Sequence, residues 1–172
     1  MVQSLPFRRC LGDIDASNFV GAMTLPSPAA GFEERVQASF ARQRFMQTLG
    51  AVLNRVEAGA VEIAMPYRPE LTQQHGFIHA GVVATMLDAA CGYAAFSLMP
   101  PDKAVLTVEY KINLLRPAQG EQLIARARVT RAGQTLTVCA GDAFMQTGDD
   151  ENVVATMLAT VIAVSQRGDL RQ

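Results

Sequence analysis

The feature that most constrains this chain is a long apolar run at 79–98, HAGVVATMLDAACGYAAFSL, which contains a single charged residue, Asp88. The run predicts a helix of about five turns. On that helix Asp88 stands on a face of small residues, and the bulkier apolar side chains lie opposite, as in a helix that packs against a sheet. The small residues nearest to Asp88 on the helix surface are Gly81, Ala84, Thr85, Cys91, Gly92 and Ala95.

A lone carboxylate in such a run needs an explanation. An ionised carboxylate in apolar surroundings is costly unless it is paired, so Asp88 requires a partner, a change in its ionisation or a functional role. Two interpretations stay open on this ground. Asp88 is either a structural residue bonded to a backbone amide or a neighbouring Thr, or a functional carboxylate.

The composition predicts one globular domain that binds neither nucleic acid nor a membrane. The 172 residues are 49% hydrophobic, which suffices for one sizeable core. The net charge of −1 offers no basic surface for nucleic acid or an anionic membrane. The small and polar residues of the run at 79–98 argue against a membrane span, and no signal sequence is recognisable.

The cysteines and histidines predict a cytoplasmic protein without a metal. Cys10, Cys91 and Cys139 are odd in number and widely spaced, which argues against a disulfide framework and favours a reducing compartment. The two histidines, His75 and His79, have no cysteine pair or acidic cluster beside them. We therefore expect no metal, no cofactor and a cytoplasmic location.

The chain divides into three parts: an irregular N-terminal extension at 1–31, one domain at 32–165 and a C-terminal tail at 166–172. The extension is set apart by its scattered Pro and Gly residues. The domain begins with an amphipathic helix from Phe32 to about Leu49, predicted by apolar residues at helical spacing. Those residues are Val36, Phe40, Phe45, Met46 and Leu49.

The sequence of the rest of the domain predicts strands before and after the long helix. A hairpin with strands near 51–58 and 60–67 comes first, and a polar loop then leads into the helix. After the helix, residues 105–116 alternate strictly, with Leu106, Val108, Tyr110, Ile112 and Leu114 on one side and Thr107, Glu109, Lys111 and Asn113 on the other. Further strands near 121–131, 135–146 and 153–164 complete four strands in meander order. The fold class is α+β, with an antiparallel sheet wrapped around the helix.

This order of elements and two stretches of sequence resemble the PaaI-type acyl-CoA thioesterases of the hotdog superfamily. QQHGFIHAGVVATMLDAACGYAA at 73–95 is similar to the family pattern HGxxHGGxxxxxxDxxxG, and VEYKINLLRPA at 108–118 is similar to the strand after the central helix. The resemblance covers about residues 32–165. It implies a hotdog fold and the hydrolysis of a small or aromatic acyl-CoA to free acid and coenzyme A.

The resemblance also implies roles for particular residues. Asp88 becomes the catalytic carboxylate, acting on water as a general base or directly as a nucleophile. Gln73 matches a position beside the thioester carbonyl, and Thr107 matches one near the attacking water.

The start of the helix carries the remaining implied roles. His79 orients the loop, and backbone amides near Ala80 and Gly81 hold the thioester carbonyl. The chain has HAG at 79–81 where the family commonly has HGG, and the methyl group of Ala80 leaves the amide donor in place. Helix N-termini suit an oxygen that gains negative charge.

Helix geometry makes such a site depend on two chains. Ala80 and Asp88 are eight residues apart, or about 12 Å along a helix, so both cannot touch one carbonyl. If both serve one reaction, Asp88 must meet the helix start of a second copy across a twofold axis. The expected assembly is a homodimer or a homotetramer, and close packing within one chain is the competing reason for the small residues.

The phosphates of an acyl-CoA substrate need cations, and Arg116 and Arg131, at strand ends near turns, are the first candidates. Two other functions stay open. One is a hotdog enoyl-CoA hydratase or dehydratase, which the HAG start and the position of Asp88 fit less well. The other is a non-catalytic acyl-CoA-binding protein of the same fold.

Overall fold

The computed structural model describes residues 25–165 of the chain, so residues 1–24 of the expected extension and the expected tail lie outside it. Three helices, one short 3-10 helix and six strands follow in chain order. They are α1 (Phe32–Arg42), α2 (Arg44–Leu49), β1 (Val52–Glu57), β2 (Ala60–Pro66), η2 (Pro69–Leu71), α3 (Ala80–Leu98), β3 (Lys103–Leu114), β4 (Gln122–Ala132), β5 (Leu136–Thr147) and β6 (Asp150–Ser165).

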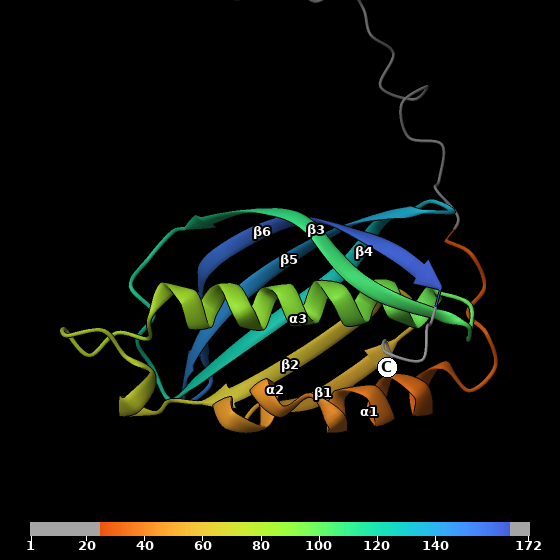
Figure 1. The fold of residues 1–172 in the computed structure, drawn as a ribbon. Coiled ribbons are helices and arrows are strands. Elements are labelled where there is room, and N and C mark those ends of the chain that lie inside the picture. The colour runs from red at the N-terminus through yellow and green to blue at the C-terminus, as the bar shows by residue number, and fades with distance from the viewer. Residues whose placement is uncertain (1–24, 166–172) are drawn as a thin grey trace, which may run out of the picture.

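The strands form one antiparallel sheet in the order β1-β2-β4-β5-β6-β3. The sheet curls around α3, with α1 and α2 beside β1, and this is the hotdog arrangement (Figure 1). The predicted α+β class is confirmed, but the predicted meander of four strands is wrong for β3. Only β4, β5 and β6 follow one another, whereas β3 pairs with β6 and forms an edge of the sheet. Length and alternation predict a strand but not its neighbour.

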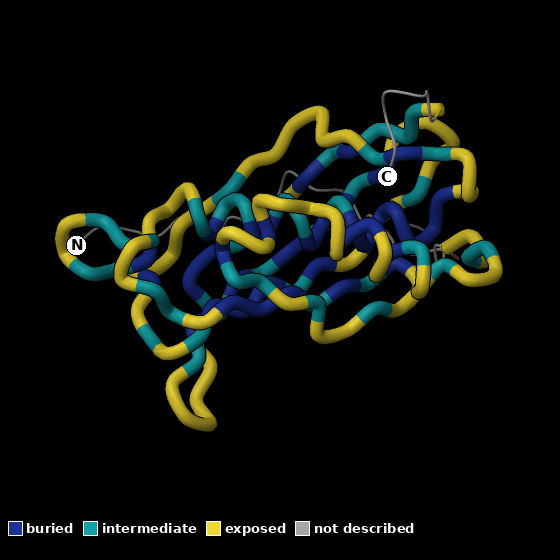
Figure 2. Tube along the Cα trace, turned by 60° about the horizontal axis from the view of Figure 1, so that its bottom comes forward, coloured by how far each residue is buried: buried dark blue, intermediate teal, exposed yellow. Residues whose placement is uncertain are grey.

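Helix α3 is the core element of the fold. Its bulky residues, among them Met86, Leu87 and Phe96, are fully buried against the sheet, and each such side chain contributes about 1.5–3 kcal/mol on burial. Figure 2 shows the buried stretches gathered through the middle of the molecule, with exposed loops around them. Ala80–Leu98 is long and apolar enough to cross a membrane, so its small and polar residues alone do not argue against a membrane span. The burial of 67% of that window marks it as a core helix.

The small-residue face predicted for α3 is narrower than the sequence indicated. Cys91 and Ala95 are fully buried, so they belong to the core side. Gly81 is exposed, and Asp88 and Gly92 are partly buried. The open face of α3 therefore runs along these three residues and the partly buried Ala84 and Thr85 between them.

The predicted helix at 32–49 is interrupted at Gln43. This residue is extended, with φ −78° and ψ 93°, and separates α1 from α2. Because the interruption turns α2, Met46 and Leu49 enter the core, whereas Phe45, which the helical pattern placed there, is 56% exposed. The single-helix prediction was wrong at this point, since apolar spacing alone does not reveal a break without Gly or Pro.

A β-bulge in β3 corrects the predicted faces of this strand. Thr107 lies opposite Val161 and Glu109 opposite Thr160, so Val108 has no partner of its own. An extra residue reverses the alternation beyond it. Thr107 therefore shares the helix-facing side with Tyr110, which lies opposite the buried Ala159.

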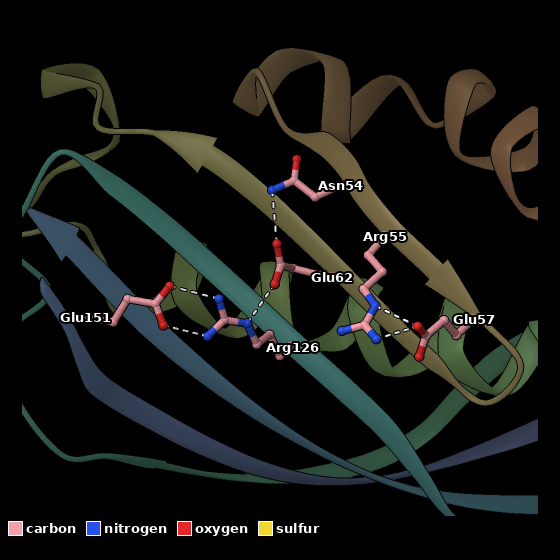
Figure 3. A network of polar contacts seen from close by, with 6 residues as sticks. All are labelled: Asn54, Arg55, Glu57, Glu62, Arg126 and Glu151. Carbon is pink, nitrogen blue, oxygen red and sulfur yellow. Dashed lines mark hydrogen bonds and ion pairs between the residues drawn. The ribbon is translucent and has the colours of Figure 1, made fainter. Parts of the chain in front are cut away.

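The outer face of the sheet carries a polar network centred on Arg126 (Figure 3). Its guanidinium donates to Glu62 at 2.6 Å and to both carboxylate oxygens of Glu151 at 2.6 and 2.8 Å. It also lies 4.8 Å from the centre of the Phe144 ring. The network ties β2, β4 and β6 together, and the hydrogen bonds from Arg126 lower the pKa of Glu151.

The variant Glu151→Gln should be less stable than the wild type at neutral pH, by up to about 1 kcal/mol in the free energy of unfolding. A carboxyl group with a lowered pKa stabilises the fold above its ordinary pKa and loses that contribution as the pH falls through the lowered value. Urea unfolding at about pH 7 and about pH 3 should therefore show a difference that shrinks on acidification. A constant or growing difference would contradict this role, and Asp149→Asn, at an exposed carboxylate in the turn between β5 and β6, is the matched control.

Candidate functional site along helix α3

The first turn of α3 is fixed by a cap from His79. This residue is extended, with φ −61° and ψ 137°, and its Nδ1 accepts a hydrogen bond from the Gly81 amide at 2.9 Å. Its carbonyl oxygen accepts the Val82 amide at 2.9 Å. An N-cap acceptor satisfies a backbone donor that the helix leaves free. The bond assigns the neutral tautomer with hydrogen on Nε2 to His79.

Gly81 leaves room for this cap. A Cβ at this position would lie 3.1 Å from Nδ1 of His79, closer than side chains normally approach. The two amides named from the sequence therefore have different roles, because the Gly81 amide is already bonded to the cap of its own helix. No acceptor within residues 25–165 bonds to the amide of Ala80, which is exposed at the first position of the helix. This amide is the donor that a ligand can use.

A cleft of about 400 Å³ opens beside Ala80. Its walls are mostly apolar, and Gln73, Ala80 and Arg116 supply its polar groups. The amide oxygen of Gln73 accepts the His75 amide at 2.5 Å, so its NH₂ group is the part left to donate. The apolar lining comes from Phe77, Ile78, Val83, Leu114, Leu115, Pro117, Ala118 and Val154.

Asp88 has a hydrogen-bond partner on strand β3, which faces helix α3. The hydroxyl of Thr107 donates a hydrogen bond to Oδ1 of Asp88 at 2.7 Å, and the bulge at Val108 is what lets this hydroxyl share the helix-facing side of β3. The pair lines a second, smaller pocket of about 110 Å³. The carboxylate therefore faces a cavity as well as its partner, and its other oxygen is available to a ligand.

The two groups lie in separate pockets of one chain. Neither Asp88 nor Thr107 lines the larger cleft, and Ala80 does not line the smaller one. The helical rise puts about 12 Å between Ala80 and Asp88, as the sequence indicated. The candidate donor and the candidate carboxylate therefore lie in two separate pockets of the chain.

The two predicted cations are not brought together. Arg116 lines the cleft, and its Nη1 donates to Asn152 at 3.2 Å. Arg131 lies near the end of β4, which approaches the C-terminal end of α3, because Val129 bonds to Gly59 and Gly59 bonds to Ser97. Within one chain Arg131 is thus at the opposite end of the helix from the cleft.

Sequence reasoning missed Gln43 and Tyr93 as neighbours of Asp88. Both line the smaller pocket. Tyr93 lies about one and a half turns beyond Asp88 on the same helix, and its position was assigned to the core. Gln43 is far from Asp88 in the sequence, and only the unexpected break between α1 and α2 brings it there, so no local signal could have found it.

The thiols near the site are core groups. Cys91 and Cys139 are free and fully buried, and Sγ of Cys139 donates to the Cys91 carbonyl oxygen at 3.4 Å. Burial raises the pKa of Cys139 to about 12 and also raises that of Cys91. A thiol with a raised pKa is a poor nucleophile at neutral pH. Within residues 25–165 no three His, Cys, Asp or Glu side chains cluster as metal ligands do.

A curved antiparallel sheet around one long helix defines a hotdog protein, and the mid-helix carboxylate and the amide at the helix start mark a candidate site along that helix. Residues 75–151 match the family model of the thioesterase superfamily. The crystal structure of a thioesterase family protein from Silicibacter pomeroyi is 52% identical, covers 79% of this chain and 100% of its own, and has a TM-score of 0.78. The chain belongs to the thioesterase superfamily.

Other known proteins are more distant. PaaI from the phenylacetic acid degradation operon of Escherichia coli shares the fold, with a TM-score of 0.73 and 20% identity over 81% of this chain and 97% of its own. A Halobacterium salinarum protein provisionally named as an esterase is 37% identical over 52% of this chain. The medium/long-chain acyl-CoA thioesterase YigI of Escherichia coli is 26% identical over 55% of this chain and 70% of its own length. The resemblance to PaaI-type hotdog thioesterases inferred from the sequence is confirmed.

The curated relatives extend beyond the matched region. The alignment spans 62% of the Halobacterium salinarum protein and 59% of a similar protein of Saccharolobus solfataricus. The chain thus spans about three fifths of the length of these curated relatives.

The variant His79→Ala should lose about 0.5–2 kcal/mol of unfolding free energy, because the Gly81 amide loses its cap. His79→Asn should retain most of the stability, since Asn is among the best N-cap residues. Urea unfolding of the three proteins measures the difference. Equal losses in both variants would show that the ring packs rather than caps.

Proposed function

We propose that the protein is an acyl-CoA thioesterase that hydrolyses a small or aromatic acyl-CoA to the free acid and coenzyme A. The observation that carries the proposal is the position of the Asp88 carboxylate, which bonds to Thr107 and faces a pocket instead of its own backbone. A structural carboxylate needs no cavity beside it. Membership of the thioesterase superfamily supports the same reaction class.

In this proposal Asp88 acts as a general base. It takes a proton from a water molecule as the water oxygen attacks the thioester carbonyl carbon, and Thr107 holds the carboxylate in place. The tetrahedral intermediate then collapses, the C–S bond breaks, and the proton passes from Asp88 to the leaving thiolate. Direct attack by Asp88 is the alternative, and a single turnover in ¹⁸O-labelled water would place the label in Asp88 only by that route.

The Ala80 amide would hold the carbonyl oxygen as it gains negative charge. One such donor at a helix N-terminus typically contributes a factor of about 10²–10³ to the rate. His79 acts as a positioning residue, because its bond to Gly81 fixes the first turn and aims the Ala80 amide outward. Gln73 can donate to the same oxygen from the wall of the cleft.

Because the two half-sites, the Ala80 amide and the Asp88 carboxylate, lie about 12 Å apart in one chain, we propose that a second copy completes each site. Strand β3 is an edge strand within the described sheet, and its Val108, Tyr110 and Leu114 are 56%, 47% and 55% exposed. Exposed apolar edges favour pairing. Antiparallel pairing of two β3 strands would set the two α3 helices antiparallel, so that each Asp88 approaches the Ala80 of the other subunit. The assembly is then a homodimer, or a homotetramer built from two dimers.

The cleft beside Ala80 suits the pantetheine arm of coenzyme A, since its walls are apolar and Arg116 stands at its margin for a phosphate. Arg131 can reach the same substrate only from the other subunit, because it lies at the far end of α3 in its own chain. We place the enzyme in the cytoplasm, where free thiols such as Cys91 and Cys139 persist.

The variant Asp88→Asn should lower kcat for acyl-CoA hydrolysis by about 10²–10⁴-fold, because it keeps the shape and removes the base. Thr107→Val, which removes only the hydroxyl, should lower kcat by about tenfold. Release of free coenzyme A from a panel of acyl-CoA thioesters measures both.

Asp102→Asn, on the exposed turn before β3, is the matched control and should leave the rate unchanged. Retained hydrolysis in Asp88→Asn would overturn the assignment of this residue. Hydration of a double bond without thiol release would overturn the reaction class.

A further inference from the structure

The pocket beside Asp88 has a role that the reaction at the carbonyl leaves unassigned. It is about 110 Å³ in volume, and its walls come from three separate parts of the chain. They are Asp88, Ala89, Gly92 and Tyr93 of α3, Val105 and Thr107 of β3, and Gln43 between α1 and α2. For comparison, an engineered protein cavity of about 150 Å³ binds benzene. The pocket suits a compact group, and an attacking water needs only part of it.

Gly92 keeps this pocket open at a cost to the helix. It lies in the interior of α3, where Gly is less favourable than Ala by about 0.5–1 kcal/mol. A Cβ at this position would meet nothing within 4 Å among the described residues, so no contact within the chain demands a glycine. The space that a side chain would fill belongs to the pocket, because Gly92 is one of its walls. Compared with Ala, Gly92 therefore makes the helix less stable and leaves a larger pocket next to the carboxylate.

Gln43 brings an amide to the same pocket. Its backbone amide bonds to Phe40, but its side chain forms no hydrogen bond within residues 25–165. The buried residues of α1 pack against α3 and β1, whereas Gln43 is exposed at the break where the chain leaves helical geometry. A polar side chain at the margin of a ligand pocket fixes the orientation of a polar group on the ligand.

We infer that this pocket receives the acyl group of the thioester, with Gly92 setting its size limit and Gln43 bonding to a polar substituent on it. The inference rests on the proposed thioesterase function and names its substrate class. The substrates are acyl-CoA esters with a short acyl chain that carries a hydroxyl or carbonyl group near the thioester. The larger cleft at the other subunit's helix start then holds the pantetheine arm, so that the thioester bond lies between the two half-sites.

The test compares acyl chains of graded size and polarity: acetyl-CoA, butyryl-CoA, 3-hydroxybutyryl-CoA and decanoyl-CoA. The wild type should prefer 3-hydroxybutyryl-CoA to butyryl-CoA by about two- to tenfold in kcat/KM, the effect of one hydrogen bond, and both to decanoyl-CoA. Gln43→Met should abolish the preference for the hydroxyl group by lowering kcat/KM for 3-hydroxybutyryl-CoA to the value for butyryl-CoA. Gln37→Met, an exposed Gln on α1 outside the pocket, is the matched control and should change neither.

Gly92→Ala should fold at least as stably as the wild type, because Ala favours the helix and meets no neighbour. It should lower kcat/KM for four-carbon chains at least about fourfold more than it lowers kcat/KM for acetyl-CoA, a factor that corresponds to one displaced methylene. Gly92→Val should extend the loss to acetyl-CoA.

Three results would overturn the inference. The first is an equal loss for every acyl chain in Gly92→Ala, and the second is an unchanged hydroxyl preference in Gln43→Met. The third is a change of oligomeric state in Gly92→Ala by light scattering, because the glycine would then serve contact between subunits.

If the wild type hydrolyses no thioester, the proposed function fails instead, and calorimetric binding of methyl and butyl thioether analogues of coenzyme A tests the pocket. Gly92→Ala should weaken only the butyl analogue, and equal weakening of both would overturn the assignment.

Discussion

The length of helix between Ala80 and Asp88 is the constraint on which the rest of this account depends. A free amide and a carboxylate that are fixed about 12 Å apart on one rigid helix cannot approach the same carbonyl group. The sheet holds the helix in place through its fully buried side chains, so bending cannot remove the distance. Each of the two groups is positioned separately. His79 accepts a hydrogen bond from the Gly81 amide and leaves the Ala80 amide free for a ligand, and Thr107 donates a hydrogen bond to Asp88. Symmetry is the simplest way to bring them together.

Most of the fold could be predicted from the sequence, because periodicity identifies elements. The long helix, the hairpin around Gly59 and the later strands all follow from apolar spacing and turn residues. Strand order could not be predicted, since nothing local in β3 indicates that it pairs with β6 instead of β4. The break at Gln43 and the bulge at Val108 were also missed. Both are shifts of one residue that leave the apolar pattern intact while changing where side chains point.

The candidate site could be predicted in its parts but not in its geometry. The isolation of Asp88 in an apolar run singles it out from the sequence alone, and the resemblance names His79, Ala80 and Thr107. The alternation of β3 places Thr107 on the wrong face, and the bulge is the reason that it reaches Asp88. Which of the Ala80 and Gly81 amides stays free depends on the orientation of the His79 ring, and no spacing in the sequence specifies that orientation.

The most direct test is complementation between two inactive variants. Ala80→Pro removes the free amide, and the fold should tolerate it, because proline suits the first helical position and His79 is already extended with ψ 137°. Asp88→Asn removes the carboxylate. When the two are unfolded and refolded together in equal amounts, half of the dimers are mixed and each contains one intact site, so about a quarter of the wild-type thioesterase activity should return. A mixture as inactive as its components would show that each chain works alone, and the shared site would be wrong.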